Sequence, residues 1–170
     1  MDAAEIVIRR LQGDADAALY REIRLESLKD APEAFLSDYE SEAARPFEHF
    51  ASRIAGSVAF GAFRGDDMLG LAAYYVEPQP RRAHKGVLWG VYVRPAARGS
   101  GLARQLVQAA LDHAADHVEA MNLIVERGNK AARRLYTGLG FVEYGLEKDA
   151  VRIGDRYFDD VLMMKELRRD

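Results

Sequence analysis

The residues best placed to do chemistry in this sequence are the glycines of a short turn, Gly99-Ser100-Gly101, which follows a β-branched and aromatic run at residues 91–93. Glycine has no Cβ, so such a turn can take left-handed backbone conformations and bring its N–H groups close to a ligand. A helix that begins beside Gly101 adds unpaired N–H groups and the positive end of its dipole. These features predict a cradle for a pyrophosphate, built from main-chain amides.

Two common phosphate-binding patterns fit this turn poorly. A P-loop needs a Lys-Ser or Lys-Thr pair after its second glycine, and none follows Gly101. A dinucleotide fingerprint needs a third glycine, but Arg104 occupies that position, and residues 95–98 separate the apolar run from the turn. The P-loop is therefore excluded, and the dinucleotide fingerprint has weak support.

A third pattern fits closely. The letters V-x-P-x-x-R-G-x-G-x-A at residues 93–103 resemble the acyl-CoA motif of the GNAT superfamily of N-acyltransferases, with Ala103 where that family most often has glycine. Residues 123–141 resemble the second GNAT motif, since Asn129 precedes a helical segment that ends in L-Y-x-x-L-G-F. Alone, Asn129 is an ordinary helix N-cap and Tyr136 a half-buried core residue. Two motifs in the family's order and spacing favour the family.

The resemblance implies an α/β (α+β) fold: a mixed, mostly antiparallel sheet of about seven strands with flanking helices, in which two strands splay apart to form an acetyl-CoA cleft. Pantetheine would lie along residues 91–93, and the pyrophosphate would meet the amides of residues 99–104. Arg98 or Arg104 would add charge, the alternative for each being a surface salt bridge. The acetyl-CoA site implied in this way comprises Val91, Tyr92, Val93, Arg98, Gly99, Ser100, Gly101, Leu102, Ala103, Arg104, Asn129 and Tyr136.

The resemblance also implies direct attack of an amine on the thioester, without an acyl-enzyme. Tyr136 matches the tyrosine that protonates the leaving sulfur, and such a positioned acid contributes about 10²–10⁴-fold. Some GNAT enzymes carry a glutamate base where this chain has Ile124, so that base is absent. The remaining base candidates are Glu126, Glu77, Tyr75 and His84, or a water chain.

The acceptor pocket is expected in the helical stretch after the first strand, at residues 32–42. Its carboxylates would attract a cationic amine, and its aromatic rings would wall a small apolar group; these residues are Glu33, Asp38, Glu40, Glu42, Phe35 and Tyr39. The alternative is a solvated acidic helix face above two core aromatics. Trp89 has the same two interpretations, and the core one is favoured.

The elements that must position these residues follow from hydrophobic periodicity and turn signals. Strands are predicted at residues 5–8, 58–63, 68–76, 88–93, 121–126, 141–146 and 157–167. Helices are predicted at residues 14–29, capped by Asp14 or Asp16, and at residues 37–43, 46–55, 102–118 and 129–139. The Arg-Gly-Asp triplet at residues 64–66 is read as a hairpin turn.

Composition limits the remaining possibilities. A chain of 170 residues with 49% apolar content predicts one domain, residues 1–170. The net charge of −3 argues against a nucleic-acid partner, and the absence of cysteine excludes disulfides, thiolate metal sites and a cysteine nucleophile. No leader and no apolar run of about 18 residues is present, so a cytoplasmic protein without a membrane partner is expected. His113 and His117 have a metal-like spacing but no third ligand, and no metal is expected.

The sequence thus predicts an N-acetyltransferase that moves the acetyl group of acetyl-CoA to a primary amine of a small molecule or of a protein or peptide N-terminus. The alternative is a non-catalytic acyl-CoA sensor or interaction module, which would keep the turn and need no acid. Tyr136 favours the enzyme. The exposed faces of the late strands leave room for a homodimer.

Overall fold

The computed structural model describes residues 4–167, which fold around one sheet of seven strands in the order β1-β2-β3-β4-β5-β7-β6. The strands are β1 (Ile6–Arg10), β2 (Val58–Arg64), β3 (Asp67–Val76), β4 (Lys85–Val93), β5 (Ala120–Glu126), β6 (Val142–Ile153) and β7 (Arg156–Glu166). Neighbouring strands are antiparallel except β4 and β5, which are parallel. The mixed, mostly antiparallel sheet expected from the sequence is confirmed.

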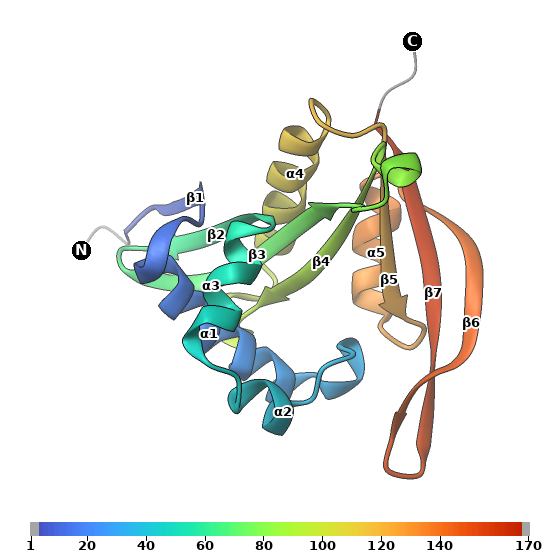
Figure 1. Cartoon of the computed structure of the whole chain (residues 1–170), viewed down its shortest axis with the longest axis horizontal. Coiled ribbons are helices and arrows are strands. Elements are labelled where there is room, and N and C mark those ends of the chain that lie inside the picture. The colour runs from blue at the N-terminus through green and yellow to red at the C-terminus, as the bar shows by residue number, and fades with distance from the viewer. Residues whose placement is uncertain (1–3, 168–170) are drawn as a thin grey trace.

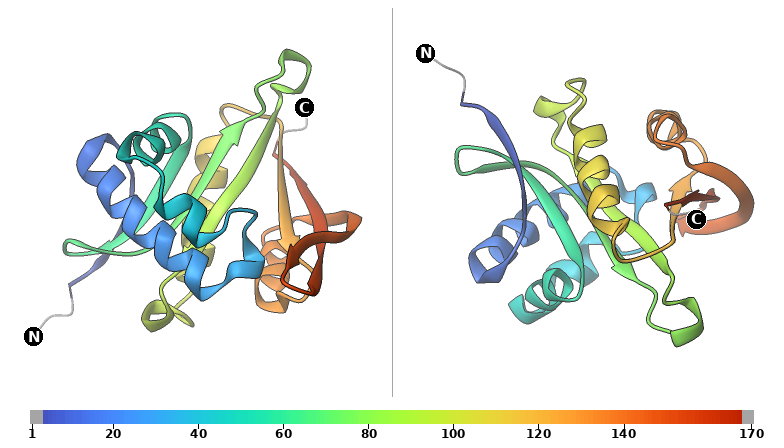
Figure 2. Two further views of the ribbon diagram at one scale, coloured as in Figure 1. Left: turned by 60° about the horizontal axis from the view of Figure 1, so that its bottom comes forward. Right: turned by 90° about the horizontal axis from the view of Figure 1, so that it is seen from above.

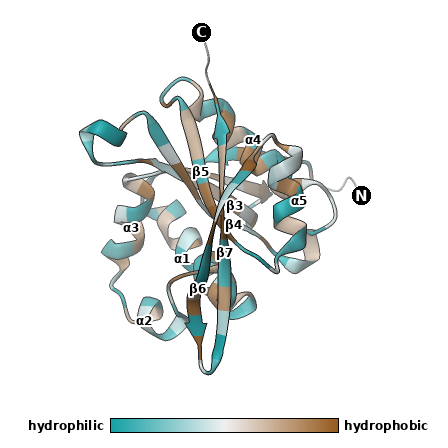
Figure 3. Ribbon diagram, turned by 90° about the vertical axis from the view of Figure 1, so that its right-hand side faces the viewer, coloured by the Kyte–Doolittle hydropathy of each residue, from teal (hydrophilic) through white to brown (hydrophobic). Residues whose placement is uncertain are grey.

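Helices cover both faces of this sheet (Figures 1 and 2). The helices are α1 (Gly13–Asp30), α2 (Tyr39–Ala43), α3 (Phe47–Ala55), α4 (Leu102–Ala114) and α5 (Lys130–Gly138), with 3-10 turns η1 (Pro32–Ala34), η2 (Pro80–Arg82) and η3 (Pro95–Ala97). One core cluster packs α4 and α5 against the sheet, and a second packs α1 and α3 against the other face. Figure 3 shows hydrophobic residues gathered on the central strands and hydrophilic ones on the turns.

Most element boundaries agree with the sequence to within a few residues, and the differences have local causes. The N-cap of α1 is Gln12 rather than Asp14 or Asp16; the Asp16 carboxylate instead accepts a hydrogen bond from the Gln12 N–H at 2.7 Å. Helix α2 begins at Tyr39, because the Asp38 side chain accepts from the Ser41 N–H and fixes the start. Helix α4 ends at Ala114 instead of residue 118. After Ala114, hydrogen-bonded turns replace the regular helix.

The feature that creates the site is the short pairing between β4 and β5. The two strands pair at Lys85–Ala120, Gly86–Met121 and Val87–Asn122, and beyond these pairs they diverge, as Figure 1 shows. On its other edge β4 stays paired with β3, with a register shift opposite Gly90, whose φ of +67° suits glycine. The splayed strands expected from the sequence are therefore present.

Within the described range 4–167, none of the helices is both long and apolar enough to cross a membrane.

Candidate functional site

A cleft of about 1010 Å³ fills the wedge between β4 and β5. Its walls come from both faces of the sheet, and we name them by their helices. The α5 side is lined by the turn before α4, the first turn of α4, and α5: Gly99, Gly101, Leu102, Ala103, Arg104, Asn129, Ala132, Leu135 and Tyr136. The α1 side is lined by α1, η1 and α3 with residues of the sheet: Arg24, Glu33, Phe35, Arg53, Tyr75, Trp89, Ile124, Glu126 and Asp160.

The glycine turn takes the backbone shape that the sequence suggested. Gly99 has a φ of +80° and Gly101 a φ of +78°, and Gly101 is the N-cap of α4 without a side-chain cap. The Ser100 hydroxyl donates to the Ala97 carbonyl at 2.7 Å and holds the turn closed. A Cβ added at either glycine would meet no atom within 4 Å, so the backbone conformation, not crowding, calls for glycine. The uncapped N–H groups of α4 therefore face open space beside the cleft.

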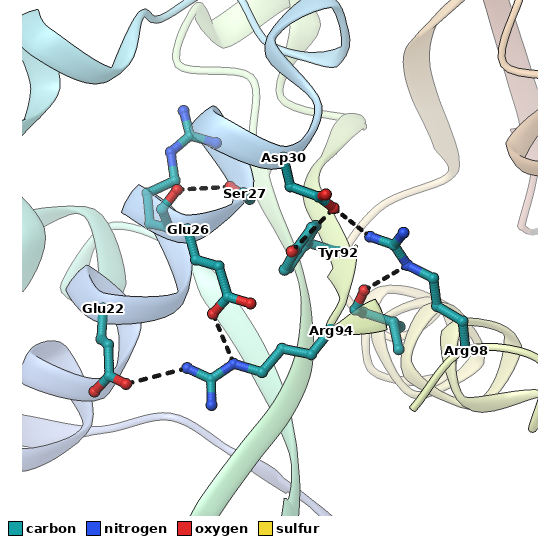
Figure 4. Close-up of polar contacts among 9 residues, drawn as sticks. Glu22, Glu26, Ser27, Asp30, Tyr92, Arg94 and Arg98 are labelled. Carbon is teal, nitrogen blue, oxygen red and sulfur yellow. Dashed lines mark hydrogen bonds and ion pairs between the residues drawn. The ribbon is translucent and has the colours of Figure 1, made fainter. Parts of the chain in front are cut away.

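The two arginines of this turn have different partners. Arg98 donates through Nε to the Val93 carbonyl at 2.9 Å and through Nη2 to Asp30 at 2.6 Å, as Figure 4 shows. Its hydrogen bond lowers the pKa of Asp30 against the opposing effect of burial. Arg104 makes a long contact of 3.5 Å to the Gly138 carbonyl at the end of α5. Of the two cations, Arg104 is the freer to meet an anion.

The strand before the turn presents mainly its backbone to the cleft. The side chains of Tyr92 and Val93 are buried in opposite core clusters, and Val91 is half-buried at the cleft wall. The Tyr92 hydroxyl donates to Asp30 at 3.1 Å; burial and the charges of Glu26 and Asp30 raise the pKa of Tyr92 to about 12. Within residues 4–167, the edge of β4 that faces β5 has no strand partner after Val87.

The second motif contributes Asn129 and Tyr136 to the same cleft. Asn129 is exposed and caps α5, since its Oδ1 accepts from the Ala132 N–H at 3.2 Å. The Tyr136 ring packs edge-on against Phe141 at 5.8 Å, and its hydroxyl has no hydrogen-bond partner among residues 4–167. Burial raises the pKa of Tyr136 above its ordinary value, so the phenol keeps its proton at neutral pH.

The four candidates for the general base differ in whether they line the cleft. Glu77 pairs with Arg82 at 3.1 Å and His84 is exposed, and neither is among the described residues that line the cleft. Glu126 and Tyr75 do line it. The Glu126 carboxylate accepts from the Gly128 N–H at 2.9 Å, while burial and the charge of Glu77 raise the pKa of Tyr75, which makes the neutral phenol more persistent.

A further titratable residue, Asp160, was missed by the sequence analysis. It lies in β7, is 6% exposed as a residue, and lines the α1 side of the cleft. Burial, followed by the charges of Glu147, Glu126 and Asp159, raises the pKa of Asp160. The available signal was a carboxylate inside a strand, directly before the apolar run Val-Leu-Met-Met.

The acidic stretch expected to hold the acceptor is divided between two roles. Glu33 and Phe35 line the cleft, but Glu42 is buried in a double hydrogen bond with Arg24, at 3.0 and 3.3 Å. Burial opposes ionisation, but Arg24 and Arg53 outweigh it and hold the pKa of Glu42 below its usual range. Glu42 is therefore a structural ion-pair partner and does not stand free for an amine.

Two of the other residues of that prediction, Asp38 and Tyr39, have partners outside the cleft. Asp38 caps α2, and Tyr39 lies under the Lys29 ammonium at 4.1 Å, while Glu40 is exposed. Trp89, favoured as a core residue, is partly buried and also lines the cleft, with the Arg53 guanidinium 4.4 Å from its ring.

His113, in the last turn of α4, and His117, just after the helix, lie outside the cleft wall. Their rings stack at 4.5 Å, and the Tyr74 hydroxyl lies 2.7 Å from Nδ1 of His113. In the part of the chain that the structure describes, no three His, Cys, Asp or Glu side chains are grouped to hold a metal ion. Gly65 of the Arg-Gly-Asp triplet occupies the turn between β2 and β3.

Comparison with known proteins gives a consistent picture. A family model described as "Acetyltransferase (GNAT) family" matches residues 21–141. A mycothiol acetyltransferase from Thermomonospora curvata is 30% identical over 146 residues, which are 84% of this chain and 46% of that protein. The chain thus spans less than half the length of this curated relative.

Solved structures superpose over nearly the whole chain. yncA from Salmonella typhimurium, whose structure includes its cofactor acetyl-CoA, gives a TM-score of 0.82 at 22% identity and covers 98% of this chain and 96% of its own. A ribosomal-protein-alanine N-acetyltransferase from Brucella melitensis gives a TM-score of 0.77 at 26% identity and covers 94% and 99%.

Proposed function

The chain belongs to the acetyltransferase (GNAT) family, and on that premise we propose that it transfers the acetyl group of acetyl-CoA to a primary amine of a small molecule or of a peptide N-terminus. The observation that carries the proposal is the open wedge between β4 and β5, which ends at the uncapped glycine turn of α4. A wedge with one free strand edge and a helix N-terminus suits a long amide-containing arm that ends in a pyrophosphate. Residues 1–170 would act as one catalytic domain.

Acetyl-CoA would bind on the α5 side of the cleft. Its pyrophosphate would accept hydrogen bonds from the amides of residues 99–104, with Arg104 as the nearby cation. Its pantetheine amides would pair with the free edge of β4 at residues 91–93, and Asn129 lies beside the path toward the thioester. The acetyl group would then reach the part of the cleft that both faces share.

The acceptor would approach from the α1 side, where the lining is partly apolar and partly charged. The amine nitrogen attacks the thioester carbon while the acetyl group is held in the wedge, so orientation of the two reactants supplies much of the rate. Tyr136 would donate its phenolic proton to the departing sulfur. Its burial and the free hydroxyl support this role, because an acid must hold its proton until the bond breaks.

The test is acetyl-CoA-dependent thiol release, measured against a panel of amines, amino acids, polyamines and short peptides. The chain has no cysteine, so a thiol reagent gives no protein background. Amine-dependent release establishes the transferase and identifies the class of acceptor. Tight acetyl-CoA binding in calorimetry without release for any amine contradicts the proposal and favours the acyl-CoA sensor.

A further inference from the structure

The unexplained group in the cleft is the carboxyl of Asp160. Asp160 is 6% exposed as a residue, its side chain lines the cleft, and it has no hydrogen bond or ion pair with any residue from 4 to 167. An unpartnered buried carboxylate is costly in free energy. Every other buried charged side chain of the described chain has an ionic partner: Asp16 pairs with Arg9, and Arg24 pairs with Glu42. Asp160 therefore has the character of a functional group rather than a structural one.

The register of the sheet places Asp160 on the α1 side. Val161 and Met163 on either side of Leu162 belong to the core cluster under α4 and α5, so Asp160 and Leu162 point to the opposite face. Leu162 is paired with Ile124, the position where a base is absent. Asp160 is thus the diagonal neighbour of Ile124 on the same face, within reach of the same part of the cleft.

Two further carboxylates flank Asp160. Glu126 of β5 and Glu147 of β6 are its direct partners in the strand register, so three acids form a row across β5, β7 and β6. Directly opposite side chains lie on the same face of a sheet and interact. This row is exposed to the cleft through Glu126 and Asp160. A cation entering from the α1 side would meet this row.

We propose that Asp160 is the general base that removes the proton from the acceptor amine, and that the row Glu126, Asp160 and Glu147 selects an acceptor arriving as a primary ammonium. The inference rests on the proposed function. It goes beyond it by naming the base and the charge state of the acceptor. Glu126 is less suited to the same task, because its carboxylate is already engaged by the Gly128 N–H.

The proton balance of the step is complete. The Asp160 carboxylate takes one proton from the ammonium, which leaves a neutral amine, and later releases that proton to solvent. The nitrogen lone pair forms the C–N bond as the carbonyl π pair moves to oxygen. The carbonyl then re-forms and the C–S bond breaks with its electron pair on sulfur. Sulfur receives the Tyr136 proton, the strongly acidic nitrogen formed by the attack gives its remaining extra proton to water, and Tyr136 is reprotonated from solvent.

Burial and the carboxylates around Asp160 raise the pKa of its side chain. The charged groups around Asp160 are Glu126 on β5, Glu147 on β6 and Asp159 beside it on β7. Glu33, Arg24 and Arg53 line the same side of the cleft. Arg127 pairs with Asp159 at 3.3 Å, and Lys148 also lies near Asp159, so these cations act mainly on that neighbour. A base is most effective when its pKa approaches the working pH, and an upward displacement moves Asp160 in that direction.

The decisive experiment compares two amines of similar shape, ethylamine and trifluoroethylamine. Fluorine withdraws electrons, so trifluoroethylamine is neutral at pH 7, whereas ethylamine is an ammonium that needs a base. In Asp160→Asn we expect kcat/KM for ethylamine to fall by about 10²–10⁴-fold and that for trifluoroethylamine to fall less than tenfold. Acetyl-CoA affinity should be unchanged, and Asp160→Glu should recover part of the ethylamine activity.

A second measurement uses the wild-type fold with a neighbouring charge removed. The kcat/KM for ethylamine should rise with pH through the pKa of Asp160, because the carboxyl must be ionised to act. In Glu147→Gln this rise should move to lower pH, since one repelling carboxylate is gone. The matched control is Glu143→Gln on the same strand, whose carboxylate pairs with Arg133 at 2.7 Å; its profile should match wild type.

Equal losses for the two amines in Asp160→Asn would overturn the inference and make Asp160 a packing residue, as would full ethylamine activity. An unmoved pH profile in Glu147→Gln would also count against it. Failure of the proposed function is distinct, because wild type would then acetylate neither amine nor any member of the panel before a variant is compared.

Discussion

Nη2 of Arg98 lies 2.6 Å from Oδ2 of Asp30, and this contact joins the last residue of α1 to the turn that precedes α4. Asp30 also accepts from the Tyr92 hydroxyl at 3.1 Å (Figure 4). The turn is thus fixed from the α1 side of the sheet, while its amides face the α5 side. A helix that borders the proposed acceptor entrance therefore helps to shape the proposed pyrophosphate site.

Asp30→Ala should weaken acetyl-CoA binding modestly. Both side chains are partly exposed, so loss of the pair costs about 0.2–1 kcal/mol, or less than about fivefold in Kd. Calorimetry gives the value. The control is Glu22→Ala, which removes the more exposed contact of Arg94 and should leave the Kd unchanged. A change of a hundredfold in Asp30→Ala would mean that Asp30 meets the ligand itself.

Gly101→Ala should raise the Kd for acetyl-CoA by about tenfold. A left-handed φ costs an L-residue roughly 1–2 kcal/mol, and the turn can relieve that strain by moving its amides out of position. Gly65→Ala is the matched control, because Gly65 has a φ of +60° in the β2–β3 turn and also has open space for a Cβ. It should lose similar stability in thermal unfolding and keep wild-type affinity. Equal Kd values for the two variants would remove the glycine turn from the site.

Tyr136→Phe should lower kcat by about 10²–10⁴-fold while the Kd for acetyl-CoA stays within about twofold. The expected split arises because only the phenolic proton is lost and the ring still packs on Phe141. Tyr74→Phe removes another buried hydroxyl, bonded to His113 outside the cleft wall, and should keep full turnover. Parallel losses of binding and turnover in Tyr136→Phe would identify a packing residue.

Asp160→Asn should be more stable than wild type at neutral pH. The folded state raises the pKa of Asp160, so between its ordinary and its raised pKa the folded chain binds more protons than the unfolded one. Stability from this group is therefore full in acid and declines as pH rises through the raised pKa. Thermal unfolding of wild type and Asp160→Asn at several pH values measures the difference in stability. The variant should become more stable relative to wild type as the pH rises, and the difference should vanish in acid. A less stable variant at neutral pH would show that the carboxylate has a favourable partner.

The two motifs allowed much of the fold and of the α5 side to be predicted, because their signals are local. Gly101 indicates a residue with positive φ just before a helix, and Asn129 indicates the start of a helix. The structure has both features at these residues. The α1 side depends on contacts between distant parts of the chain. Asp30 and Arg98 are 68 residues apart, and nothing near either residue indicates the pair.

The charged residues of the sequence did not show which carboxylates stand free in the cleft, because their partners also lie far apart in the chain. Glu42 looked available for an amine, but its partner Arg24 lies 18 residues earlier on another helix. The sequence assigned Asp160 no role, and the register of three strands places it beside Glu126 and Glu147. Helix and strand periods give the face of a residue, but they do not give its partners across the sheet.

The brevity of the β4–β5 pairing has a mechanical consequence. Within residues 4–167, three residue pairs form the whole ladder between these strands, so few main-chain hydrogen bonds connect the two parts of the sheet. A ligand that forms hydrogen bonds to the free edge of β4 and also contacts β5 would connect the part of the sheet from β1 to β4 with the part formed by β5, β7 and β6. We therefore expect acetyl-CoA to slow amide hydrogen exchange at residues 88–93 and to make the two parts unfold as a single cooperative unit.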